Sequence, residues 1–160
     1  MTDDITTLPV RPTGLDDLQA LVGRDIGPTD WVPVTQELVN AFAEVTDDHQ
    51  WIHVDPERAA TSPLGTTIAH GLLVLSLGPG LSYKLMSFDG FAHGLNYGYD
   101  KVRFVSPLPV GSRIRMRMQV LGAEAAGGGI QIRTLQTFER EGQEKPICVA
   151  ESLVMYFENA

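Results

Sequence analysis

Apolar residues recur with two different periods along the chain, and the change falls near residue 90. Before that point the spacing is helical. The clearest example is residues 35–45, where one stripe of a helix with about 3.6 residues per turn is apolar. Its members are Leu38, Val39, Phe42 and Val45. Thr35 can cap this helix, and three short polar residues at positions 46–48 are expected to end it.

Residues 70–83 are apolar on nearly every side of a helix, which predicts a helix surrounded by other elements. Pro79 lies within this segment and lacks a backbone N–H. We therefore expect the helix to bend or end there.

From residue 94 onward the period falls to two, which is typical of strands. In residues 113–118, Ile114, Met116 and Met118 face one side and arginines face the other. Further strands are expected at residues 95–105, 130–138 and 147–157. The first of these changes phase between its aromatic and its later apolar residues, so a bulge is predicted near Asp100.

A buried helix followed by about four antiparallel strands predicts an α+β fold, in which the sheet curls around a central helix. Such a sheet leaves an edge strand, and pairing with a second copy would satisfy it, so a homodimer is expected. The length of 160 residues fits a single domain over residues 1–160, with residues 1–24 as a polar N-terminal leader.

Composition narrows the function classes. The formal net charge is −8, which disfavours nucleic acid and anionic membranes as partners. The acidic N-terminus does not resemble a secretory signal, and residues 68–81 are too short and too interrupted for a membrane span. Cys148 is the single cysteine, so no intrachain disulfide can form. A cytoplasmic setting is the expectation.

Reactive side chains are densest in residues 46–56. Asp48 and His53 are five positions apart across an irregular turn, where both could hydrogen-bond one water and carry out acid–base chemistry. The alternative is structural, with the aspartates capping helices and His53 partly buried. A metal site on His49, His53 and Asp55 would need a continuous helix and lacks a second motif, so no metal is expected.

A second small cluster, His70 and Gly71, lies at the predicted entry of the buried helix. Backbone N–H groups without helical partners converge at such an entry. They can stabilise a developing negative charge on an oxygen.

These residues resemble the MaoC-like, R-specific enoyl-CoA hydratases, whose typical motif is GDxNPxHxD followed by HG at the start of a buried helix. The intervals from Asp48 to His53 and from His53 to Gly71 match that pattern. The segments DHQWIHVDPERAA, GTTIAHG and NYGYDKVRF are similar to the NodN-like branch of the family. The resemblance spans about residues 25–157.

The resemblance implies a hot-dog fold, usually dimeric, and the hydration of trans-2-enoyl thioesters of coenzyme A to R-3-hydroxyacyl thioesters, or the reverse. It places Asp48 and His53 at the catalytic positions and the Gly71 amide opposite the thioester oxygen. Coenzyme A is then part of the substrate, and no separate cofactor is expected. Further contacts with the substrate are expected from His70, Gln50 and Tyr97.

The arginines of residues 113–118 concentrate positive charge in an acidic chain. Arg113 and Arg115 could bind the phosphates of coenzyme A, although a solvated strand face is the simpler and preferred interpretation of each arginine. Two other classes of function compete with a hydratase. A hot-dog thioesterase would use a carboxylate-activated water on the same ligand, and a non-catalytic module would bind the acyl thioester without turnover.

Overall fold

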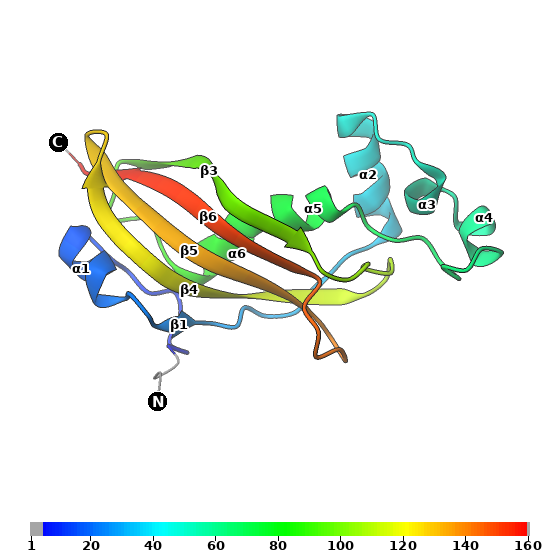
Figure 1. Ribbon diagram of the computed structural model, residues 1–160, viewed down its shortest axis with the longest axis horizontal. Helices are drawn as coiled ribbons and strands as arrows, with labels where there is room; N and C mark the ends of the chain where they lie inside the picture. Colours follow the sequence, from blue (N-terminus) through cyan, green and yellow to red (C-terminus); the bar gives the residue numbers. More distant parts are fainter. Residues whose placement is uncertain (1–4, 160) are drawn as a thin grey trace.

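A curved antiparallel sheet dominates the computed structural model, which describes residues 5–159 (Figure 1). The sheet has six strands, in the order β1-β4-β5-β6-β3, with β2 also paired to β4. The strands are β1 (Asp25–Ile26), β2 (Val32–Pro33), β3 (His93–Phe104), β4 (Arg113–Ala126), β5 (Gly129–Arg140) and β6 (Cys148–Phe157). The helices are α1 (Leu15–Ala20), α2 (Gln36–Thr46), α3 (Trp51–Val54), α4 (Pro56–Ala60), α5 (Gly71–Ser76) and α6 (Gly78–Leu85).

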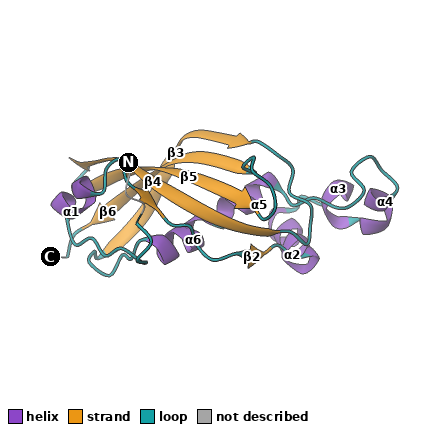
Figure 2. Ribbon diagram, turned by 90° about the horizontal axis from the view of Figure 1, so that it is seen from below, coloured by secondary structure: helices purple, strands orange, loops and turns teal. Residues whose placement is uncertain are grey.

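The concave face of the sheet wraps around α5 and α6, as Figures 1 and 2 show. The period-two pattern of β4 produces this packing, because Ile114, Met116 and Met118 all point inward and are at most 2% exposed. The bulge expected near Asp100 is confirmed by a register shift between Tyr99 and Lys101 in the pairing of β3 with β6. The sequence prediction of the sheet and its central helix is therefore correct.

The central helix is broken in two. The first part, α5, ends at Ser76, and α6 begins at Gly78 with Pro79 in its first turn. Proline is tolerated at that position because the first N–H groups of a helix have no intrahelical partner. The bend expected at Pro79 thus lies just before it, and the helix continues to Leu85.

Three apolar side chains that the sequence places on buried faces are exposed. Val45 on α2 is 86% exposed, and the central helix exposes 60% of Leu72 and 58% of Tyr83. The expectation of a fully surrounded helix is wrong, because the sheet covers only the side of the helix that faces its concave surface. Residues near the N-terminus pack more closely than a polar leader suggests, since Leu18 of α1 is completely buried.

The start of α2 is fixed as the sequence predicts. The Thr35 hydroxyl accepts a hydrogen bond from Leu38 N–H at 3.2 Å, and Asp47 ends the helix in the left-handed conformation with φ of 58°. Within residues 5–159, no helix combines the length and the apolar character required to cross a membrane.

Replacing the cap gives a test of this local structure. Thr35→Ala removes the acceptor for Leu38 N–H and is expected to lower the free energy of unfolding by about 1 kcal/mol. For a chain of this length that corresponds to a melting temperature lower by about 2 to 4 °C in differential scanning calorimetry. Thr35→Ser keeps the hydroxyl and should stay within about 1 °C of the parent. Equal melting temperatures for the Ala and Ser variants would contradict the cap.

Candidate active site

An extended segment, residues 67–70, connects α4 to the central helix and is hydrogen-bonded on both sides. We call it the crossing strip. Ile68 N–H donates to the Ile52 carbonyl at 2.9 Å, and Ala69 N–H donates to the Leu108 carbonyl at 2.8 Å. The crossing strip therefore joins the turn that carries the reactive side chains to the loop before β4.

Helix α2 strengthens this connection through the side chain of Gln36. Its amide nitrogen donates to the His53 carbonyl at 2.7 Å, and its amide oxygen accepts from the Thr67 hydroxyl at 2.6 Å. One side chain at the start of α2 thus holds both the backbone of His53 and the beginning of the crossing strip.

The His53 imidazole is buried, with 7% of the residue exposed. Its Nδ1 lies 2.7 Å from the Ile68 carbonyl oxygen, which can only accept a hydrogen bond. The proton is therefore on Nδ1 in the neutral ring, and Nε2 carries a lone pair that can accept a proton. The crossing strip selects the tautomer that a general base requires.

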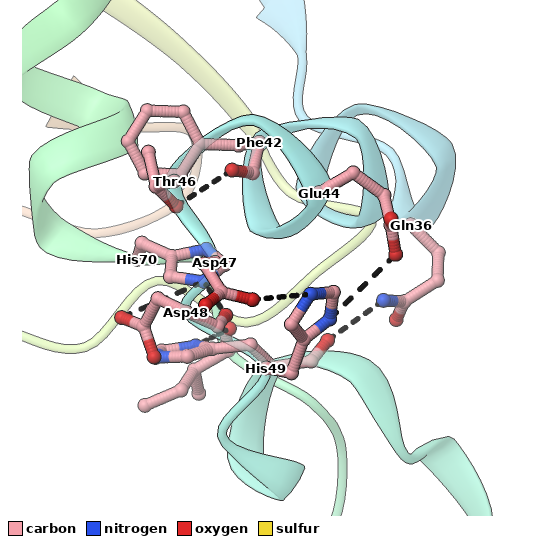
Figure 3. Close-up of polar contacts among 10 residues, drawn as sticks. Gln36, Phe42, Glu44, Thr46, Asp47, Asp48, His49 and His70 are labelled. Atoms are coloured by element: carbon pink, nitrogen blue, oxygen red, sulfur yellow. Dashed lines mark hydrogen bonds and ion pairs between the residues drawn. The ribbon is translucent and has the colours of Figure 1, made fainter.

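His70 lies against His53 and is 3% exposed. The two rings stack with centroids 3.8 Å apart and an angle of 25° between their planes. The Nε2 atom of His70 is 3.0 Å from the backbone carbonyl oxygen of Asp48, so the proton of the neutral ring is on Nε2. Its Nδ1 is buried and has no hydrogen-bond partner among the described residues. His70 thereby orients the His53 ring. It also holds the backbone of Asp48 (Figure 3).

The Asp48 carboxylate is about half exposed, at 51%, and one oxygen lies 3.9 Å from His70 Nε2. A carboxylate oxygen of Asp48 and a ring nitrogen of each histidine lie within 4.8 Å of one another. A water that hydrogen-bonds two groups at the tetrahedral angle holds them about 4.6 Å apart. Asp48 and His53 are therefore close enough for one water molecule to bridge them.

These groups open into a cavity of about 320 Å³. Asp48, His53, His70 and Gly71 lie on one side of it, and Phe104 and Cys148 are contributed by the ends of two strands. Gly71 is the first residue of α5, so its N–H has no partner within the helix. The cavity thus combines a proton acceptor, room for a water and an amide donor that has no partner within its own helix.

Gly71 also permits a close approach between the helix and the sheet. A Cβ atom at this position would lie 2.8 Å from Cδ1 of Phe104, which is shorter than a normal van der Waals contact. A glycine therefore lets the aromatic ring of Phe104 cover the backbone beside the amide donor.

The same three side chains are close enough to be considered as metal ligands. However, the stacked rings of His53 and His70 are nearly parallel, so their in-plane lone pairs do not converge on one point. The geometry is better suited to water than to a cation. The ligand set considered from the sequence, His49, His53 and Asp55, is dispersed. His49 pairs with Glu44 and Asp47 (Figure 3), and Asp55 caps α4.

Of the residues expected to contact substrate, His70 lines the cavity and the others lie outside its lining. Gln50 is exposed at the start of α3, and Tyr97 on β3 is 69% exposed. Arg113 and Arg115 lie on β4 and form ion pairs with Glu141 and Glu139. The structure does not bring these four residues to the cavity of this chain.

Sequence reasoning missed the Ile68 carbonyl, which fixes the tautomer of His53. A backbone group leaves no signal in the residue type. It also missed Phe42, whose ring centroid lies 5.1 Å from that of His70. The helical stripe of α2 marked Phe42 as apolar and inward-facing, but the pattern could not identify its neighbour.

The curved sheet around a central helix is a hot-dog fold, and its site pairs a carboxylate with an imidazole at a helix entry. Residues 17–140 match the MaoC like domain, and the chain belongs to that family.

Two curated relatives match most of the chain. The 3-hydroxyacyl-thioester dehydratase Z of Mycobacterium tuberculosis is 52% identical over 141 residues, which cover 88% of this chain and 93% of that protein. Nodulation protein N of Rhizobium leguminosarum is 41% identical, over 85% of this chain and 86% of the relative. Among solved structures, the R-hydratase PhaJ1 of Pseudomonas aeruginosa has the same fold, with a TM-score of 0.71 and 22% identity over 86% of this chain and 83% of that one.

The cavity thiol gives a test of the local environment. Burial raises the pKa of Cys148 to about 11, because the thiolate loses its hydration. At pH 8 about one thiol in a thousand is then ionised. We expect an aromatic disulfide reagent to label the folded protein at least about a hundredfold more slowly than the protein in guanidinium chloride, and the rate to rise with pH. Equally fast labelling of folded and unfolded protein would contradict this assignment.

Proposed function

We propose that this chain catalyses the reversible hydration of trans-2-enoyl thioesters of coenzyme A to R-3-hydroxyacyl thioesters. The observation that carries the proposal is the spacing of Asp48 and His53 around a position for one water, beside the free N–H of Gly71. Family membership and the 52% identity to a protein named as a 3-hydroxyacyl-thioester dehydratase support the same reaction.

In the proposed mechanism the water lies between the Asp48 carboxylate and the lone pair on His53 Nε2. Both groups accept hydrogen bonds from this water, so an oxygen lone pair is free to attack C3 of the enoyl thioester. The dyad takes one proton from the water as the new C–O bond forms. The same proton is then delivered to C2. We assign the primary acceptor role to Asp48 and the positioning and shuttling role to His53, with the two protonation states coupled.

Attack at C3 moves negative charge to the thioester oxygen, which needs a hydrogen-bond donor. The Gly71 N–H is placed for this role at the first residue of α5. A preorganised backbone donor of this kind is worth several kcal/mol in related chemistry. No separate cofactor is needed, because water, one carboxylate, one imidazole and one amide supply every proton transfer and the charge stabilisation.

The dyad holds the water and delivers its proton to C2 on the same face of the double bond. The addition is therefore expected to be syn. The R configuration follows if the thioester lies with its oxygen at Gly71 and its C3 toward Asp48. The proposed setting is the cytoplasm, in keeping with the free buried thiol of Cys148.

We also propose that the chain acts as a homodimer that pairs through β3. This strand is at one edge of the sheet and is largely exposed. Large apolar side chains are exposed on β3, and others are exposed on the central helix. The set consists of Leu72, Tyr83, Leu95, Tyr97 and Phe104. An edge strand flanked by such side chains is suited to pairing with a second copy.

Matched substitutions of neighbouring aspartates test the dyad. Asp48→Asn and His53→Gln each remove a proton acceptor and are expected to lower kcat for crotonyl-CoA hydration by about 10² to 10⁴. Asp47→Asn makes the same chemical change one residue earlier, on a carboxylate that lies outside the cavity lining, and should leave kcat within about twofold. The assay follows loss of the enoyl absorbance, with chiral analysis of the product.

An Asp48→Asn variant with undiminished hydration would remove the assignment. Release of free coenzyme A thiol without loss of the enoyl group would instead identify a thioesterase.

A second measurement tests the dimer. Tyr97→Glu places a charge on the exposed face of β3 and is expected to shift the protein from dimer to monomer in size-exclusion chromatography with light scattering. Leu121→Glu makes a similar change on β4, which β5 and β6 separate from β3 in the sheet, and should leave the dimer intact. A monomeric parent protein at micromolar concentration would contradict the proposal.

A further inference from the structure

A second cavity, of about 280 Å³, lies between α6 and the concave face of the sheet. Most of its walls are apolar, including Met86, Met118 and Val154. It is distinct from the cavity that contains the dyad, since the two share no lining residue. The mechanism proposed above does not use it.

Four buried polar side chains form one side of this cavity. They are Ser82, Thr134, Gln136 and Ser152, none more than 8% exposed. We call them the polar floor. Burying a hydroxyl or an amide beside apolar side chains costs free energy unless its hydrogen bonds are satisfied, so four such residues together need an explanation.

Hydrogen bonds within the polar floor use only part of its capacity. The hydroxyls of Thr134 and Ser152 are 2.7 Å apart, and that bond uses one of their two protons. The Gln136 amide nitrogen donates to the hydroxyls of Ser82 and Ser152, both at a long 3.3 Å. The Gln136 amide oxygen is buried with no hydrogen-bond partner among the described residues. That oxygen lies against the start of α6, where a Cβ on Gly78 would be 3.1 Å from it, so it is not exposed to the cavity. The polar floor therefore offers a ligand its spare hydroxyl protons.

The two cavities follow one another along the same helix and the same strand. Val74 of α5 and Cys148 of β6 line the cavity of the dyad, whereas Ser82 of α6 and Ser152 of β6 line the second one. Ser152 is four positions after Cys148 along β6, and this length of strand spans about 13 Å. Three bonds of an extended chain span about 3.6 Å, so an acyl chain of about eleven bonds covers this distance.

We infer that the second cavity receives the distal part of the acyl chain, and that the polar floor selects chains that carry a hydroxyl group there. The oxygen of a ligand hydroxyl can accept the spare protons of the polar floor. A plain alkyl chain fills the apolar walls but leaves the polar floor unsatisfied. The preferred substrates are therefore hydroxylated medium-length enoyl thioesters. This inference rests on the proposed function for its substrate class and extends it to the chain.

Binding measurements separate this inference from the proposed reaction. Saturated hexanoyl, octanoyl, decanoyl and dodecanoyl thioesters of coenzyme A, each with and without a terminal hydroxyl, are titrated into the protein by calorimetry, where no turnover occurs. At the length that reaches the polar floor, we expect the hydroxylated ligand to bind at least about tenfold more tightly than the plain one. Crotonyl-CoA hydration is measured separately and tests the dyad alone.

A double variant, Thr134→Val with Ser152→Ala, removes the two hydroxyls with little change in volume. It is expected to abolish or reverse the preference for hydroxylated chains while leaving crotonyl-CoA hydration within about twofold. Thr137→Val is the matched control, because it makes the same change on the outward face of β5 and should preserve the preference.

Several results would overturn the inference. One is equal or weaker binding of the hydroxylated ligand at all four lengths in the parent protein, which needs no variant. Another is a preference that persists unchanged in a folded double variant. If the hydroxyl preference is found but crotonyl-CoA is not hydrated, the proposed reaction fails and the chain-binding inference stands.

Discussion

The hydrogen bond between His53 Nδ1 and the Ile68 carbonyl is the interaction on which the rest of the site depends. It links a side chain of the short helix α3 to the backbone of the crossing strip, and it determines which ring nitrogen faces the cavity. The crossing strip is itself held by Ile52 on one side and Leu108 on the other. Catalytic geometry in this protein is therefore set by backbone hydrogen bonds between segments that are distant in sequence, and not by the short helix that contains His53.

This arrangement explains why the sequence predicted the fold better than the site. Apolar residues alternate with arginines along residues 113–118, and this pattern determines which face of β4 is buried. The capping residue Thr35 fixes the start of α2. Both are local signals, and both predictions are confirmed. Asp48 and His53 lie close together along the chain, and the structure brings both to one cavity, while their role as a dyad stays a prediction.

What the sequence could not provide is the environment of those residues. The stacking of His70 on His53 joins positions 17 residues apart, and the acceptor for His53 is a carbonyl that any residue type would supply. The arginines of β4 are the reverse case, because the sequence shows the cluster but not the partners that it meets in the sheet. Their clustering is real, but pairing with β5 brings glutamates opposite them, and Arg115 is held by Glu139. A row of charge in sequence is no guide to which charges remain available after strands pair.

The interior of this protein departs from a core optimised for stability alone. The Thr134–Ser152 hydrogen bond places two hydroxyls in the core where apolar groups of the same shape would need no partner, and the Gln136 amide depends on one of them as an acceptor. Conflicts between a residue and its surroundings tend to be found at functional sites, where binding repays the cost. The His53–His70 pair and the polar floor are both conflicts of this kind, and both border cavities beside the central helix. The break between α5 and α6 lies between them, so one half of the helix begins at the cavity of Asp48 and His53 and the other half lines the second cavity.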